Sequence, residues 1–157
     1  MDHPYLGPAR VRSYISCGDE MSDLARLVGI YKALAHPVRL RILAMLRRGK
    51  LCVCQMTAAL ELAASTVSAH LAELKRAGLV RESKEGRWVR YRLAESPEGR
   101  AFVEPAWKTI ARDPQVRADA RLLRDLRRVS VEQLCRVDLD LGRLGIRRPL
   151  AAEARGR

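Results

Sequence analysis

An apolar stripe between residues 64 and 77 restricts the possible folds more than any other feature of the sequence. Val67, Leu71 and Leu74 fall at positions i, i+4 and i+7, which predicts an amphipathic helix with one buried face. A second short helical segment, Gln55–Leu60, precedes it, and residues 61–63 form a turn of about three residues between them. Gly78 supplies a C-terminal cap. This order of elements predicts a helix-turn-helix motif, whose second helix is the recognition helix for DNA.

Length and charge agree with a nucleic-acid partner. The 157 residues hold no internal repeat and fit one domain with flanking arms. Thirty Lys and Arg residues against 18 Asp and Glu give a formal charge of +12, which favours a polyanion. We find no apolar run long enough for a membrane helix and no signal-peptide core near Met1, so we expect a cytoplasmic protein. In that compartment the four cysteines favour metal or redox chemistry over a disulfide framework.

The chain before the motif divides into an arm and two helices. Residues 1–20 show no sustained period and predict a flexible N-terminal arm, which contains Cys17. Ser22 is the expected N-cap of a first helix, which stops before Pro37 because proline disfavours helix in the preceding residue. Pro37 opens a second helix with a wide apolar face, and Gly49 ends it.

The chain after the motif predicts a β-hairpin. Residues 79–83 and 88–93 are rich in β-branched and aromatic side chains, and a turn containing Gly86 separates them. Strict alternation places one set of side chains on a basic face and the other on an apolar face; the sets are Trp88, Arg90 and Arg92 against Val89, Tyr91 and Leu93. A basic hairpin that follows a helix-turn-helix is a wing, so the predicted class is mainly α with a small β-hairpin wing.

Three further helices are expected beyond the hairpin. One begins at Pro97 and contains Pro105, which can kink it, and another begins after the N-cap Asp113. A capping box at residues 130–133 opens a tail helix whose apolar residues continue to Leu144, and the chain from Arg147 is expected to be disordered. We therefore divide the chain into an arm (1–20), a winged-helix DNA-binding and dimerisation domain (21–128) and a C-terminal tail (129–157).

Several segments together resemble the ArsR/SmtB repressors. They are ALAHPVRLRIL at 33–43, LCVC at 51–54, STVSAHL at 65–71, AGLV at 77–80 and GRWVRYRL at 86–93. The resemblance covers roughly residues 22–128. It implies a winged-helix homodimer that represses by binding a palindromic operator and leaves the DNA when a metal or metalloid binds. It also implies a dimer interface built from the first helix and the helices after the wing.

The LCVC segment resembles the arsenic-responsive branch of that family, which implies Cys52 and Cys54 as ligands of arsenic(III) or antimony(III). The chemistry agrees, since these soft centres prefer thiolates to imidazole or carboxylate. Cysteines at i and i+2 converge where extended backbone enters a helix, so chelation there would distort the helix start and reposition the recognition helix. Some members carry a third cysteine where this chain has Thr57. The third ligand stays open between an exogenous group, Cys17 of the arm and Cys135 of the tail.

Exposed polar residues of the recognition helix and basic residues of the wing are the candidates for DNA contact. Short hydroxyl side chains contact phosphates or several bases, and Lys and Arg supply sequence-independent affinity. Ala63 stands where a Ser or Thr cap is usual, so the start of this helix is less well defined. The candidates are Ser65, Thr66, Ser68, His70, Lys75, Lys84, Arg87 and Arg90.

The cysteines and the basic residues also allow other interpretations. The cysteine pair could be small buried hydrophobic residues, and the surplus of arginine a solvated surface. A repressor of the same fold that senses cadmium, lead or thiol oxidation is the main alternative, with an arm cysteine joining the pair in the cadmium and lead case. A thiol-redox enzyme is remote, because the sequence has no Cys-x-x-Cys motif and no histidine adjacent to the pair. We predict that the protein is not an enzyme.

Overall fold

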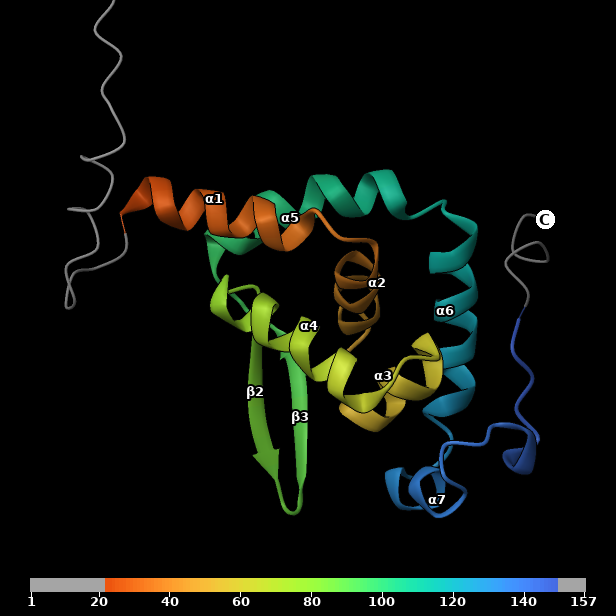
Figure 1. Ribbon diagram of the computed structural model, residues 1–157. Helices are drawn as coiled ribbons and strands as arrows, with labels where there is room; N and C mark the ends of the chain where they lie inside the picture. The colour runs from red at the N-terminus through yellow and green to blue at the C-terminus, as the bar shows by residue number, and fades with distance from the viewer. Residues whose placement is uncertain (1–21, 150–157) are drawn as a thin grey trace, which may run out of the picture.

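Residues 22–149 are described by the computed structural model (Figure 1). The predicted arm, including Cys17, lies outside these residues, as does the end of the tail. In chain order the elements are α1 (Asp23–Leu34), α2 (Pro37–Leu46), β1 (Leu51–Cys52), α3 (Val53–Leu60), α4 (Ala64–Arg76), β2 (Val80–Glu85), β3 (Trp88–Leu93), α5 (Pro97–Ile110), α6 (Pro114–Leu126), α7 (Val131–Arg136) and a 3-10 turn η2 (Gly142–Leu144).

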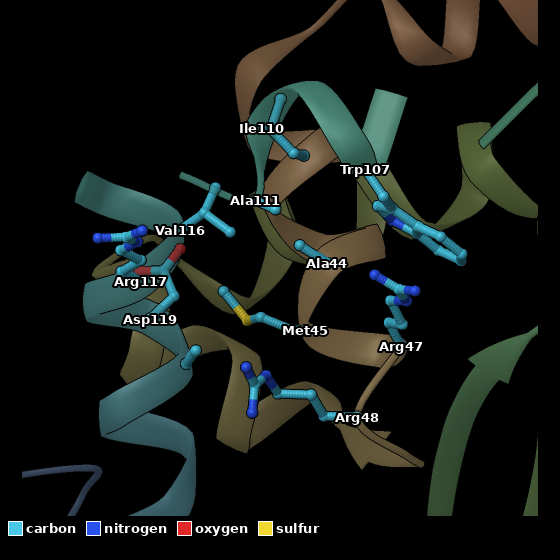
Figure 2. A pocket seen from close by; sticks show the side chains of 11 residues that line it. Ala44, Met45, Arg47, Arg48, Trp107, Ile110, Ala111, Val116, Arg117 and Asp119 are labelled. Atoms are coloured by element: carbon cyan, nitrogen blue, oxygen red, sulfur yellow. The ribbon is translucent and has the colours of Figure 1, made fainter. Parts of the chain in front are cut away.

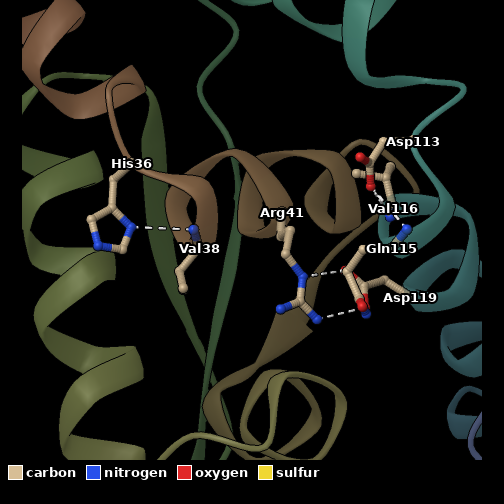
Figure 3. Close-up of polar contacts among 7 residues, drawn as sticks. All are labelled: His36, Val38, Arg41, Asp113, Gln115, Val116 and Asp119. Atoms are coloured by element: carbon tan, nitrogen blue, oxygen red, sulfur yellow. Dashed lines mark hydrogen bonds and ion pairs between the residues drawn. The ribbon is translucent and has the colours of Figure 1, made fainter. Parts of the chain in front are cut away.

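Helices α1 and α6 begin at the caps that the sequence predicts, whereas the His36 cap of α2 was not predicted. The Ser22 hydroxyl accepts a hydrogen bond from a backbone N–H in the first turn of α1 (3.2 Å). Before α2, His36 Nδ1 accepts from the N–H of Val38 (3.2 Å), and before α6 the Asp113 carboxylate accepts from the N–H of Gln115 (2.8 Å; Figure 3). Each cap satisfies a donor that a helix start leaves unpaired, so the side chains set where these helices start.

The helix-turn-helix and the wing form as predicted, and a third strand joins the wing. α3 and α4 are connected through residues 61–63, with Glu61 in the left-handed region (φ 57°). β2 and β3 pair antiparallel, and β1 adds to the other side of β3 to give the order β1-β3-β2. Leu51 lies opposite Tyr91 and Cys52 opposite Arg90. This mainly helical fold with a small hairpin is a winged helix-turn-helix.

The core lies where α2, α3 and α4 meet the sheet. Ile42 and Leu43 of α2 are fully buried, and the α4 stripe of Val67, Leu71 and Leu74 is buried as its spacing predicts. Burying such side chains contributes about 1.5–3 kcal/mol each. Within residues 22–149 no helix combines the length and apolar character needed to cross a bilayer.

One apolar surface stays exposed along α1. Leu24, Leu27, Val28 and Tyr31 expose 72%, 37%, 42% and 58% of their surface. α1 lies beside α5 at the edge of the molecule farthest from the wing tip (Figure 1), and the rings of Tyr31 and Phe102 meet edge to face at 5.6 Å. This is the surface where the sequence predicts the dimer interface, and the dimer stays a prediction.

The tail differs from its prediction. α7 stops at Arg136 and does not continue to Leu144, because Asp138 and Leu139 adopt positive φ values of 51° and 63° that no helix accommodates. The prediction of disorder from Arg147 is wrong for residues 147–149: Arg148 pairs with Glu61 (3.1 Å) and donates to a carbonyl of α3. The tail therefore packs back on the helix-turn-helix.

The two faces of β3 also differ from the alternation that the sequence predicts. Val89, which the alternation predicts to lie on the apolar face, is exposed (42%). Arg90 is half-buried because it pairs with Glu85 of β2 (Nε to Oε2 2.9 Å). Trp88 is half-buried because Glu132 of α7 accepts its indole N–H (2.8 Å). Pro105, in contrast, interrupts nothing, and α5 runs through it.

A buried ion pair fastens α6 to α2. Arg41 donates to both oxygens of Asp119 at 2.7 and 2.8 Å, and Asp119 is only 3% exposed (Figure 3). Bidentate pairs of this kind are strong, and removing one partner leaves a charge that is poorly solvated. The pair connects the helix at the centre of the core to the helix that leads to the tail.

We expect Asp119→Asn to lower the free energy of unfolding by about 2–4 kcal/mol, because Arg41 loses its counter-charge inside the fold. Urea denaturation measures the change. The matched control is Asp125→Asn on the same helix, whose partner Arg128 is exposed and 3.6 Å away; it should change stability by less than about 0.5 kcal/mol. Equal losses in the two variants would contradict a special role for the buried pair.

Candidate functional site

The two cysteines of LCVC meet where the wing sheet becomes a helix. The sulfurs of Cys52 and Cys54 are 3.1 Å apart. Cys52 is the last residue of β1 and also the N-cap of α3, with extended backbone (φ −91°, ψ 165°). Because the chain changes from strand to helix at this residue, side chains two positions apart converge instead of pointing to opposite sides.

Gln55 stabilises this junction from the core side. Its side-chain oxygen accepts the backbone N–H of Cys52 (3.1 Å) and faces the Cys52 thiol at 3.4 Å. The Gln55 side chain is buried, at 5% exposure, and it satisfies a donor that would otherwise be lost in the core. The sequence analysis did not single out this residue, although its position three residues after an N-cap is a capping signal.

The surroundings favour one thiolate in the pair. A hydrogen bond from the Cys54 thiol is the main cause that lowers the pKa of Cys52 to about 6, with help from the backbone N–H groups that begin α3 and from the charge of Arg90; burial opposes the shift. The hydrogen bond with Cys52, together with burial, raises the pKa of Cys54 above its ordinary value. The opposite shifts favour a thiolate on Cys52 and a protonated thiol on Cys54.

A third thiol lies beside the pair. α7 packs against α3, and its residue Cys135 lies near enough to Cys54 to contribute to the raised pKa of Cys54. Cys54 and Cys135 are half-buried, so both can be reached from solvent, whereas Cys52 is buried. Across residues 22–149 no group of three or more His, Cys, Asp or Glu side chains is already arranged to hold a metal ion.

The exposed face of α4 holds the predicted hydroxyl groups. Ser65, Thr66 and Ser68 are exposed. His70 is half-buried, and its ring lies 4.5 Å from that of His36. Burial, followed by the charge of His36 and Arg39, lowers the pKa of His70, so this imidazole is neutral at physiological pH. Contact of these residues with DNA stays a prediction.

Acidic neighbours pair with much of the predicted basic surface. Lys75 pairs with Glu82 (2.6 Å), and Arg90 with Glu85. Lys84 is exposed at the wing tip. The prediction of a basic wing surface did not consider Glu82 and Glu85, the two acidic residues of β2 that pair with basic side chains.

The wing tip also contacts α7. Glu132 accepts hydrogen bonds from Trp88 Nε1 (2.8 Å) and from Arg87 (3.2 Å). Its own backbone N–H, then Trp88 and Arg87, lower the pKa of Glu132 to about 2, so the carboxylate stays charged throughout the physiological range. The short helix α7 thus contacts the thiol pair through Cys135 and the wing through Glu132.

The pocket between α2, α5 and α6 is separate from the thiols. Its lining is apolar with a basic rim, and Arg47 lies over the Trp107 ring at 4.6 Å (Figure 2). None of the residues predicted as ligands or DNA contacts lines it. The candidate site is therefore the thiol cluster with the adjoining α4 and wing.

Comparison with known proteins identifies the class. Residues 36–82 match the family described as "Bacterial regulatory protein, arsR family". The chain is 38% identical over 94 residues to the arsenic resistance transcriptional regulator ArsR1 of Pseudomonas putida, covering 59% of this chain and 72% of the relative. It is 35% identical over 112 residues to the arsenical resistance operon repressor of Escherichia coli K12, covering 71% and 90%. HlyU from Vibrio cholerae has a similar structure (TM-score 0.52, 38% identity, covering 59% of this chain and 99% of HlyU).

The family and these relatives are DNA-binding transcriptional regulators of the winged-helix class. The chain belongs to the ArsR family.

We expect Cys54→Ala to raise the pKa of Cys52 from about 6 toward its ordinary value of 9.0, because the main hydrogen-bond donor to the thiolate is lost. Thiolate absorbance followed against pH, with Cys17 and Cys135 replaced by serine, measures it. Since the folded-state pKa is depressed, the thiolate stabilises the fold above the ordinary pKa, and this stabilisation is lost as the pH falls through about 6. A parent protein that titrates only near the ordinary value would contradict this account.

Proposed function

We propose that this protein is a dimeric repressor that arsenite or antimonite releases from operator DNA by bonding to Cys52 and Cys54. The observation that carries the proposal is the 3.1 Å contact between the two sulfurs at the junction of β1 and α3. The names of the Pseudomonas putida and Escherichia coli relatives support arsenic as the inducer.

The chemistry needs no oxidant or reductant. Each As–OH bond of arsenous acid is exchanged for an As–S bond, and a protein thiol supplies the proton that leaves with hydroxide as water. Two thiols therefore give two As–S bonds and two waters. Where one cysteine is already a thiolate, the missing proton comes from solvent. The soft arsenic(III) and antimony(III) centres favour sulfur over the oxygen and nitrogen ligands around the site.

The fold connects this site to DNA recognition. Cys52 pairs with β3 of the wing and starts α3, and α3 packs against α4. An inducer that fixes both sulfurs changes the backbone where the sheet and α3 join, and the position of α4 depends on that junction. Release follows if the altered arrangement fits the operator less well than the free one.

The DNA-binding state is a homodimer in this proposal. The exposed apolar residues of α1 beside α5 supply the surface for a second copy, and the two α4 helices then face two operator half-sites. The formal charge of +12 assists approach to DNA. Ser65, Thr66 and Ser68 of α4 and Lys84 and Arg87 of the wing are the proposed contacts, together with His70, Lys75 and Arg90 where their present partners permit.

The deciding experiment is fluorescence anisotropy of the reduced protein on its own promoter DNA. The complex is titrated in parallel with arsenite, antimonite, cadmium, lead, zinc and peroxide, with a non-thiol reductant except in the peroxide arm. We expect release by arsenite and antimonite and no arsenite response in Cys54→Ser. Release by cadmium, lead or peroxide, with arsenite ineffective, would replace the metalloid assignment with one of the alternative sensors.

Lys84→Ala should reduce the salt dependence of operator affinity. Each phosphate contact contributes about one unit to the slope of log affinity against log salt, and Lys84 is exposed on the wing. Anisotropy titrations at several salt concentrations give the slope. The control is Lys108→Ala on α5, at the end of the molecule away from the wing tip (Figure 1), where the slope should not change. A slope that stays the same in Lys84→Ala would remove Lys84 from the interface.

A further inference from the structure

The pair by itself does not complete the coordination of arsenic(III). Arsenic(III) forms three bonds, so two protein sulfurs leave one position with hydroxide. A soft centre gains most from a third thiolate. A protein sulfur within reach of Cys52 and Cys54 is therefore the donor that would stabilise the complex most.

α3 itself offers no such sulfur. One turn beyond Cys54 stands Thr57, whose buried hydroxyl oxygen has no hydrogen-bond partner within residues 22–149. A neutral hydroxyl is a hard and weak ligand for arsenic(III). Its position on the same face as Cys54 nonetheless marks where a third donor on α3 would lie.

α7 does offer a sulfur. The helix packs against α3, with Leu134 buried in the common core, and this places the half-buried Cys135 on the side of α3 that carries Cys54, near enough to influence the pKa of Cys54. Ser130 and Gln133 form a reciprocal capping box that fixes the start of α7 (3.0 and 3.1 Å). Both thiols come from the same subunit.

We infer that Cys135 supplies the third thiolate, so that each subunit holds arsenic(III) in a three-sulfur site joining α3 to α7. This rests on the proposed function. Arsenous acid and three thiols give a site with three As–S bonds and three waters, without electron transfer. Because no group of three ligands is already arranged for a metal within residues 22–149, forming the third bond draws Cys135 toward the pair. The helix that moves also holds the wing through Glu132.

X-ray absorption at the arsenic edge tests the inference by counting sulfur neighbours in the full-length protein with one equivalent of arsenite. We expect three sulfurs in the unaltered protein and in Cys17→Ser, and two sulfurs with one oxygen in Cys135→Ser. The arsenite concentration for half-release of DNA should rise by about a hundredfold in Cys135→Ser, because the third bond closes within the molecule at high effective concentration.

A rescue variant separates loss of a ligand from loss of structure. Thr57→Cys in the Cys135→Ser protein should restore three sulfur neighbours and much of the sensitivity to arsenite. Circular dichroism and arsenite-free operator affinity should match the unaltered protein in each variant.

The outcomes distinguish the inference from the function on which it rests. Three sulfurs in Cys135→Ser, or a loss of sulfur in Cys17→Ser instead, would overturn the role of Cys135 while leaving the arsenic sensor intact. Absence of arsenite binding to the unaltered protein would overturn both.

Discussion

The pairing of β1 with β3 is the constraint on which the proposed sensor site depends. This two-residue strand makes Cys52 part of the wing sheet, and the next residue begins α3. The change from strand to helix brings the sulfurs of Cys52 and Cys54 to 3.1 Å, and Gln55 secures the turn from the core. The wing also contacts α2, α3 and α4 through side-chain packing, but β1 adds a backbone connection to β3. With it, Cys52 belongs both to the wing sheet and to the start of α3, so in the proposed mechanism a ligand bound there acts on both.

Although the net charge is +12, several basic side chains of α4 and the wing are paired with carboxylates. Glu82 and Glu85 of β2 pair with Lys75 and Arg90, while Glu132 of α7 holds the wing tip. Such exposed pairs add little to stability, because solvent screens the attraction between their charges. Their larger effect is to orient basic side chains in the absence of DNA. In the proposed complex with DNA, Lys75 and Arg90 would exchange these carboxylates for phosphates, so we expect local rearrangement on binding.

Much of the fold could be predicted because local signals dominate it. The α4 stripe, the Ser22 and Asp113 caps and the Gly86 hairpin each follow from residues close in sequence. What could not be predicted depends on distant contacts. β1 exists only by pairing with β3, and α7 ends because Asp138 and Leu139 turn the chain back. The position of Cys135 beside Cys54 follows from that fold of the tail, 81 residues further along the chain, and has no local signal.

In the proposed mechanism, a ligand on the thiols alters α3 and, through it, the recognition helix α4. Hydrogen–deuterium exchange of the reduced, DNA-free protein with and without arsenite measures this directly. We expect altered amide protection in the first turn of α3, in residues 61–63 and at the start of α4, with little change in the middle of α6. Release of DNA by arsenite with unchanged exchange throughout α3 and α4 would contradict it.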